Sequence, residues 1–515
     1  MKNLIVSFVV SIFLLGCCSN TASDSVVNDV NDSTDIEIRS SSVQLNNAFY
    51  WAKKKARSYV QTNKSGKVNQ SEFSSGGGNV KYIPSYWAGY PFRTAFYSRD
   101  YCHQMVGAHL LGLYEENYQM LRAFAKSSTL ARKWYPLWAI NFDGSIYKVD
   151  YKSDDNFVRE VPAVFELVEK AYRQYLWTND SRLLNDPVLW SYYQRSVSDF
   201  ISLHDANNNG IAEGSGTSDI FKGIATYNEG MDKYPCLEAG DGIASQYQAL
   251  LSYSKLVNAK GNNNEAKIWY DKAESIKSYF ENIWSKTTTN NLYVRGYDVQ
   301  GNPHWDFARE TSWFMPMKHI TDAGLRNKDF LNYISTSLNS AQKIPSNIES
   351  ITYLPDVFFP YNHVEEGWYW TCYILNSLNK LHAVSMGGTD GDYPEISYTL
   401  ISNVVENLLG FQPNAPKNEF STIPRLPLEL AYLEVKNIPI GNNLVSVKHV
   451  GNKMTLITNV SGGDIKCNIQ FYGSYTLIDV DGSKQKAIPG KLNGEITSSV
   501  SVLIPPTKSI IAKVL

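Results

Sequence analysis

Residues 161–177, VPAVFELVEKAYRQYLW, show the pattern that decides the fold. Apolar side chains such as Val164, Leu167, Val168 and Ala171 recur at spacings of three and four, which indicates an amphipathic helix. Helix pairs without intervening strands favour a ring of helical hairpins over a parallel α/β sheet. No fixed-period repeat is visible, which argues against a regular solenoid. The same pattern returns in residues 104–113, 118–127, 189–204, 242–259, 264–284, 328–341, 367–381 and 396–409.

The composition changes after Pro413. Residues 414–427 form a connector rich in Pro and Asn, and alternating apolar and polar residues replace the helical spacing beyond it. We therefore predict a helical domain over residues 44–413, a linker over 414–427 and an antiparallel β-sandwich over 428–515. The expected strands are 444–450, 454–460, 468–472, 497–503 and 509–515.

The N-terminus has the form of a bacterial lipoprotein signal. Residues 1–16 combine a positive start with a short apolar run. The stretch LLGC at 14–17 resembles a bacterial lipobox, in which the thiol of Cys17 would be acylated. Residues 17–43 are polar and poor in aromatics, which fits a flexible tether. We expect a protein anchored to the cell envelope by lipid, either periplasmic or on the outer-membrane surface. A net charge of −2 argues against a nucleic-acid partner.

The remaining cysteines, Cys102, Cys236, Cys372 and Cys467, are widely scattered and lack metal-site spacing. Buried free thiols are therefore expected. The chain holds 34 Tyr and 12 Trp, more aromatic residues than a core alone requires. Aromatic rings pack well on the flat faces of sugar rings, so the composition favours a carbohydrate-binding cleft.

Residues 229–235, EGMDKYP, place two carboxylates three positions apart on a glycine-containing loop ahead of a predicted helix. Such a loop can present a carboxyl group to a pocket while the helix fixes its position. The stretch resembles the Glu-Ser-Gly-Met-Asp-Asn-Ser-Pro signature of glycoside hydrolase family 63 and the related trehalases, although it lacks the Ser. The resemblance implies that Asp232 is the general acid. Glu229 and Glu238 could raise the pKa of Asp232 by like-charge repulsion, or Glu229 could bind a sugar hydroxyl or brace the loop.

A second cluster, FYSRDYCHQ at 96–104, contains Arg99, Asp100 and His103 among aromatic residues. It resembles the Trp-Asp segment early in these barrels, whose Asp grips hydroxyls of the sugar at the cleavage site. Charge-assisted hydrogen bonds of this kind are strong. The alternative is a buried ion pair at a helix start. Trp87 and Trp138 are candidate cleft walls, and core packing is the alternative for each.

The second catalytic carboxylate is predicted near NHVEEGWYW at 362–370, which faintly resembles a helix entry of the trehalase-like enzymes. Glu366 and Glu365 rank first as the general base, Glu395 next and Asp392 last, with Trp368 as a sugar contact. The helix dipole alone also favours glutamates early in a helix. ISYT at 396–399 resembles the start of the last barrel helix in family 63, but residues 376–394 contain no Glu.

Three short stretches resemble the junction between barrel and β domain in the α-L-rhamnosidases: LLGFQP at 408–413, IPRLP at 423–427 and IPIG at 438–441. The resemblance covers most of the chain and implies an (α/α)6 six-hairpin barrel followed by a β domain. DANNNGIAE at 205–213 matches the first ligand positions of a calcium loop, but Gly216 replaces the required Glu. We expect a structural turn there, with bound Ca²⁺ as the alternative, and no other metal or cofactor.

These observations predict an exo-acting, inverting glycoside hydrolase that uses Asp232 as acid on oligosaccharides. A polysaccharide lyase or unsaturated-uronyl hydrolase on the same barrel is the alternative enzyme, because Arg99 and His103 could handle a uronate. A non-catalytic carbohydrate-binding lipoprotein is the alternative of another class.

Overall fold

The computed structural model describes residues 34–69, 77–228, 234–286, 292–340, 344–383 and 388–515. The predicted signal peptide, Cys17, most of the tether, Glu229 and Asp232 lie outside the described residues. No helix in the described ranges is long and apolar enough to cross a membrane.

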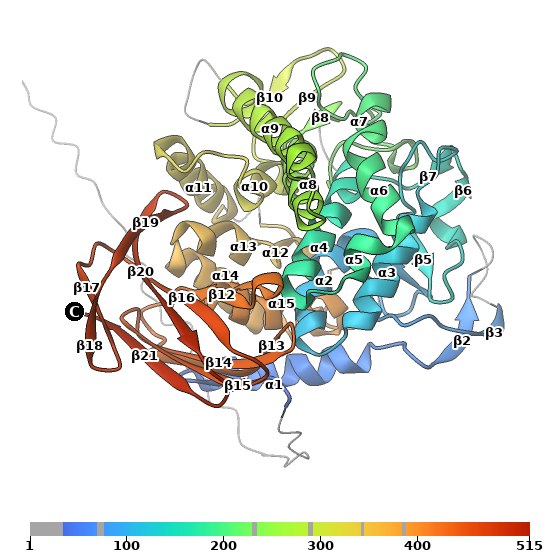
Figure 1. Ribbon diagram of the computed structural model, residues 1–515. Helices are drawn as coiled ribbons and strands as arrows, with labels where there is room; N and C mark the ends of the chain where they lie inside the picture. Colours follow the sequence, from blue (N-terminus) through green and yellow to red (C-terminus); the bar gives the residue numbers. More distant parts are fainter. Residues whose placement is uncertain (1–33, 70–76, 229–233, 287–291, 341–343, 384–387) are drawn as a thin grey trace, which may run out of the picture.

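Six helical units of the described chain form an inner ring, in which each unit packs on the next and the last packs on the first (Figure 1). In order they are α2 (Ser98–Leu110), α4 (Val161–Thr178), α8 (Gly240–Ala259), α10 (Arg309–Met317), α12 (Ile348–Ile351) with α13 (Leu354–Phe358), and α15 (Pro394–Ser402). A π-helical turn, η6 (Asn403–Leu408), continues α15.

The outer layer alternates with the inner ring along the chain. Its helices are α1 (Val43–Ser58), α3 (Tyr114–Ser127), α6 (Pro187–Val197), α9 (Asn263–Tyr279), α11 (Leu325–Leu338) and α14 (Val364–Ser377). Within each hairpin the chain reverses direction, so the inner helices begin at one end of the barrel and the outer helices begin at the other. The predicted six-hairpin barrel is confirmed for the described residues, and the two ends differ in chemistry.

The sequence explains why the inner ring closes. In α4 the buried side chains lie on more than one face, as expected for a helix with neighbours on both sides. Helix α2 meets α15 at Gly107, where an added Cβ would lie only 2.1 Å from the carbonyl oxygen of Tyr398. Any larger residue at position 107 would therefore push the two helices apart.

Two sheets form the C-terminal domain (Figure 1). Among the described residues, the seven-stranded sheet has the order β1 (Glu37–Ser40), β13 (Tyr432–Ile440), β14 (Asn443–Val450), β15 (Met454–Ser461), β21 (Ser509–Val514), β17 (Leu477–Val480) and β18 (Ser483–Lys486). The five-stranded sheet has the order β11 (Gln412–Asn414), β12 (Glu419–Thr422), β16 (Ile465–Tyr472), β20 (Glu495–Ile504) and β19 (Ile488–Leu492).

Three details of this domain differ from the sequence prediction. Strand β1 comes from the predicted tether and pairs with β13, so the last part of that segment belongs to the fold. The predicted linker supplies β12 and the end of β11. Strands β12 and β16 pair in parallel, so the β domain is mixed rather than purely antiparallel.

The two domains share one hydrophobic core. The indole of Trp177 stacks on Phe411 with ring centroids 5.3 Å apart. The backbone carbonyl of Trp177 accepts a hydrogen bond of 2.8 Å from the Gly441 amide. His109 contacts the Pro439 carbonyl through Nε2 at 3.2 Å. The cysteines at 102, 236, 372 and 467 are buried free thiols, as predicted.

Candidate active site

Carboxylates gather at the end of the barrel where the inner helices begin. Each inner helix has one in its first turn or at the residue before it: Asp100, Glu160, Asp241, Glu310, Glu349 and Glu395. All except Asp100 are buried. The positive ends of the helix dipoles favour negative charge here, but burial opposes it. This end of the barrel, the acidic end, therefore holds several carboxyl groups, most of them buried.

Asp100 lies at the start of α2 and accepts a short hydrogen bond from the Tyr393 hydroxyl. Burial, followed by the negative charge of Glu395, raises the pKa of Asp100 to about 7, against the lowering effect of the Tyr393 bond. Asp100 is the most exposed of these carboxylates. It can therefore meet a ligand and also change its charge near neutral pH.

Glu349 lies on the short helix α12. Its Oε2 accepts a hydrogen bond of 2.5 Å from the Asn347 amide, and its Oε1 lies 3.7 Å from His382 Nε2. Burial, followed by the charge of Asp100, raises the pKa of Glu349 to about 8. A carboxyl group with a pKa in this range suits proton transfer at near-neutral pH.

Glu395 and Asp356 are bridged by His103. His103 Nδ1 lies 2.5 Å from Glu395 Oε1, and Nε2 lies 3.3 Å from Asp356 Oδ2. Burial lowers the pKa of His103, but the hydrogen bonds to Asp356 and Glu395 outweigh it and raise that pKa above its usual value. The ring of Tyr353 stacks on His103 at 3.9 Å, which fixes the imidazole.

The Arg99 side chain is buried and extends from α2 toward neighbouring inner helices of the barrel. Its guanidinium donates to the Tyr227 carbonyl at 3.0 Å and contacts Glu310 at 3.4 Å. Glu310 also accepts a hydrogen bond of 3.0 Å from the Ser350 hydroxyl. Arg99 therefore links the starts of α2 and α10 to the segment before α8.

Asp241 is fully buried at the start of α8. It accepts hydrogen bonds from the Thr226 hydroxyl at 2.9 Å and the Tyr227 amide at 2.7 Å. Burial raises its pKa to about 7. These bonds hold the chain that leads into residues 229–233.

Glu229 and Asp232 themselves lie outside the described residues, but both flanks of their segment are at this end of the barrel. The Asn228 amide contacts Thr311 on α10 at 3.5 Å, and the Tyr234 ring stacks on His304 at 4.6 Å. The roles of Glu229 and Asp232 stay predictions.

The three predicted tryptophans have different positions. Trp138 donates to Glu160 Oε2 at 2.9 Å and packs edge-to-face on Tyr97, so it belongs to the acidic end. Trp87 donates to the Arg93 carbonyl at 2.8 Å and packs on Phe142, so it is half-buried against the core. Trp368 is buried at the opposite end of the barrel, where it donates to Glu429 of the β domain.

The predicted general bases Glu365 and Glu366 do not join this site. They begin α14, an outer helix, and therefore lie at the opposite end of the barrel. Glu365 accepts a hydrogen bond of 3.0 Å from the Leu428 amide, and Glu366 lies 3.7 Å from His363, whose hydrogen bond lowers the Glu366 pKa. Glu365 and Glu366 therefore lie apart from the carboxylates of the acidic end.

The two lower-ranked candidates for the general base, Glu395 and Asp392, have different surroundings. Glu395 belongs to the acidic end, as described above. Asp392 forms an ion pair of 2.6 Å with Lys55, caps the turn at Thr389, and has a pKa lowered chiefly by the Lys55 bond. In this structure Asp392 therefore holds Lys55 and the turn at Thr389.

The loop that resembles a calcium site is held by its own backbone. Asp205 accepts hydrogen bonds from the amides of Asn209 at 2.9 Å and Gly210 at 2.8 Å. Within the described ranges, no group of three or more His, Cys, Asp or Glu residues has an arrangement that could hold a metal ion.

Sequence reasoning missed Glu310, Glu349, Tyr393 and His382. A usable signal existed, because each inner helix has an acidic residue at its start. That signal requires knowing which helices are inner, and α12 is only 4 residues long, too short to show a helical period.

Neither protein-family profiles nor curated protein sequences give a match to this chain. Solved structures do match. The α-L-rhamnosidase from Dictyoglumus thermophilum aligns with a TM-score of 0.58 at 12% identity, covering 93% of this chain and 50% of that protein. The Streptomyces avermitilis α-L-rhamnosidase, solved with L-rhamnose, aligns with a TM-score of 0.56 at 9% identity, covering 94% and 42%. A sialidase aligns with a TM-score of 0.51 at 11% identity, covering 84% and 40%.

This likeness establishes the fold: a six-hairpin (α/α)6 barrel with a C-terminal β domain. The chain spans 50% of the length of the Dictyoglumus protein, 42% of the Streptomyces protein and 40% of the sialidase. At these identities, the activity and the sugar of each matched protein remain properties of that protein.

Proposed function

We propose that this chain is an exo-acting, inverting glycoside hydrolase that works at the end of the barrel where the inner helices begin. The observation that carries the proposal is the cluster of Asp100, Glu349 and Glu395, where burial and then mutual repulsion raise the pKa values of Asp100 and Glu349. Glycosidases need one carboxyl group that donates a proton and one that activates water. A purely structural acidic cluster has no need of protons that exchange near neutral pH.

In this proposal Asp232 protonates the departing oxygen and Glu349 removes a proton from the attacking water. The family 63 signature supports the first role. The second rests on Glu349 being more accessible than Glu395, with side-chain exposures of 10% and 3%. His103 fixes Glu395, and the Glu395 charge in turn helps to hold a proton on Asp100.

A screen of aryl glycosides and plant or algal oligosaccharides tests the proposal. The expected result is release of a terminal sugar, with the anomer of the product inverted when followed by NMR. A product that absorbs in the near ultraviolet would instead indicate a lyase. Binding without any turnover would favour the non-catalytic alternative.

Asp100→Asn should lower kcat/KM by roughly a hundredfold, because loss of a charged hydrogen bond in a buried site costs on the order of 2–4 kcal/mol. The predicted partner is a sugar hydroxyl, so KM should rise along with the fall in kcat. Steady-state kinetics beside Asp271→Asn, an exposed acid on α9, measure this effect. Wild-type kinetics for Asp100→Asn would assign Asp100 a structural role.

The pH profile tests the role of Glu349. A general base works only when ionised, and the pKa of Glu349 is about 8. We expect kcat/KM to rise with pH and to level off above pH 8. Two pH units below the pKa, kcat/KM should be roughly a hundredfold lower than on this plateau. A profile that instead falls as pH rises through 8 would show that Glu349 works in its protonated form, as the donor.

We also propose that the enzyme is tethered to the bacterial envelope through an acylated Cys17. The lipobox and the polar segment that follows support this proposal. A tethered exo-hydrolase would act on oligosaccharides released close to the cell surface.

A further inference from the structure

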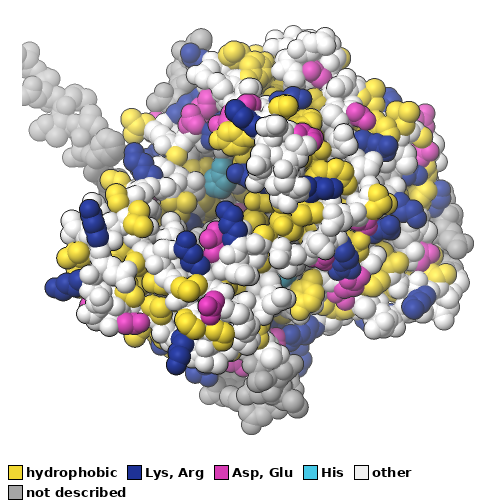
Figure 2. All heavy atoms as spheres, viewed as in Figure 1, with side chains coloured by type: hydrophobic (Ala, Val, Ile, Leu, Met, Phe, Trp, Pro, Cys, Tyr) yellow, Lys and Arg dark blue, Asp and Glu magenta, His cyan; other side chains and the backbone are white. Residues whose placement is uncertain are grey.

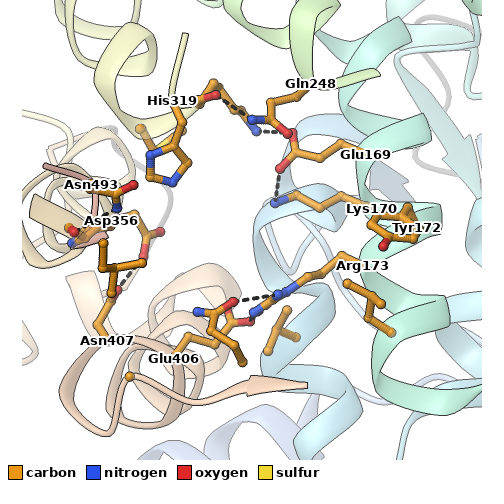
Figure 3. A pocket seen from close by; sticks show the side chains of 18 of the residues that line it. Glu169, Lys170, Tyr172, Arg173, Gln248, His319, Asp356, Glu406, Asn407 and Asn493 are labelled. Atoms are coloured by element: carbon orange, nitrogen blue, oxygen red, sulfur yellow. Dashed lines mark hydrogen bonds and ion pairs between the residues drawn. The ribbon is translucent and has the colours of Figure 1, made fainter. Parts of the chain in front are cut away.

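A cavity lies at the opposite end of the barrel, between the ends of the inner helices and the β domain. It has a volume of about 540 Å³, and Figure 3 shows its polar side chains facing one another across the space. Figure 2 shows that the surface is hollowed between the helical barrel and the β domain. The volume falls within the range of about 300–1,000 Å³ that is typical of small-molecule sites.

The carboxylates of this cavity already have cationic partners. Lys318 contacts Glu166 and, at 2.6 Å, Glu169. Glu406 forms an ion pair with Arg173, and Asp356 contacts His103. The cavity therefore carries no unbalanced block of charge of either sign, which disfavours a phosphate or a multivalent cation as its ligand.

Neutral hydrogen-bonding groups are available instead. Gln248, Asn407 and Asn493 line the cavity (Figure 3) and use their amide nitrogens on the Lys318 carbonyl, Asp356 and the Pro360 carbonyl, respectively. Among the described residues, no protein donor contacts their side-chain oxygens. These amide oxygens are acceptors suited to the hydroxyl groups of a ligand.

His319 adds a neutral donor or acceptor at the wall of the cavity. Burial lowers its pKa to about 4, so the imidazole is uncharged at physiological pH. Nδ1 lies 3.3 Å from the Tyr361 hydroxyl, and among the described residues Nε2 has no protein partner. Its backbone has φ = 56°, a left-handed conformation that is costly for a non-glycine residue and is concentrated at functional sites.

We propose that this cavity is a second, non-catalytic binding site for a neutral mono- or disaccharide. Balanced charge, uncommitted amide oxygens and a neutral imidazole match a ligand that presents many hydroxyls and no net charge. Lys170, which reaches Glu169 at only 3.5 Å, can turn a donor toward the ligand. The proposal does not depend on hydrolysis, because none of the six carboxylates of the acidic end lines the cavity. His103, Asp356 and Tyr353 line it and lie between the two sites.

Calorimetric titration of the full chain with L-rhamnose, D-glucose and lactose tests this site, with inorganic phosphate as the charged probe. Asp100→Ala is the background, because it weakens sugar binding at the catalytic end. On this background we expect one saturable event with at least one of the sugars. Leu176→Trp, which places an indole in the cavity, and Lys170→Met should each weaken that event at least tenfold. Lys267→Met, the same change at an exposed position on α9, should leave it intact.

The proposal is overturned if the Asp100→Ala chain binds none of the sugars, if both cavity variants bind like Lys267→Met, or if phosphate binds more tightly than every sugar. Lys170→Met keeps the test valid should Leu176→Trp fail to fold. Because binding is measured directly, failure of this site and failure of the proposed hydrolase activity give different results.

Discussion

Asp232→Asn should lower kcat/KM for a natural oligosaccharide by about 10²–10⁴-fold, because the amide keeps the shape of the side chain but has no proton to transfer. The size of the loss depends on how much the leaving group needs protonation. Aryl glycosides with a very acidic phenol should lose much less. The ratio of the two losses, measured by steady-state kinetics, is the signature of a proton donor.

Asp271→Asn is the matched control for this experiment, because Asp271 is exposed on the outer helix α9 and pairs only with Lys267 in the described structure. It should leave both substrates unaffected. A folded Asp232→Asn enzyme with full activity on the natural substrate would end the assignment of Asp232. An equal loss on both substrates would move Asp232 to another role.

The fold could be predicted from the sequence because helical periodicity is local. The segment 161–177 becomes α4, and the alternation after residue 443 becomes β14 and β15. The pairing of β1 with β13 joins residues almost four hundred positions apart, as in the contact of Glu37 with Lys436, and no local pattern reports such a pairing. The parallel pairing of β12 with β16 escaped prediction for the same reason.

The candidate site was predicted only in part. Arg99, Asp100 and His103 were found because they share one motif and lie at the start of an inner helix. Glu365 and Glu366 also lie in a first turn, so the sequence makes them look equivalent. The difference is that α14 is an outer helix, and whether a helix is inner or outer depends on how the ring closes.

Glu349→Gln should lower kcat/KM by about 10²–10⁴-fold on natural oligosaccharides and on aryl glycosides alike, because both substrates need an activated water. This uniform loss separates it from Asp232→Asn, which should spare the activated substrates. The substitution removes the carboxyl group while keeping a partner for Asn347. The rise of kcat/KM through pH 8 should disappear in the same variant.

Glu365→Gln and Glu366→Gln are the matched controls, since they make the same chemical change at the opposite end of the barrel. If catalysis takes place at the end of the barrel where the inner helices begin, both variants should keep wild-type kinetics. Loss of activity in Glu366→Gln together with an unaffected Glu349→Gln would restore the base predicted from sequence. Glu349→Gln that loses only natural substrates would make Glu349 the proton donor, because activated leaving groups then bypass the missing proton. Each outcome therefore identifies a carboxyl group as proton donor or general base from its effect on the kinetics, not from its position in the sequence.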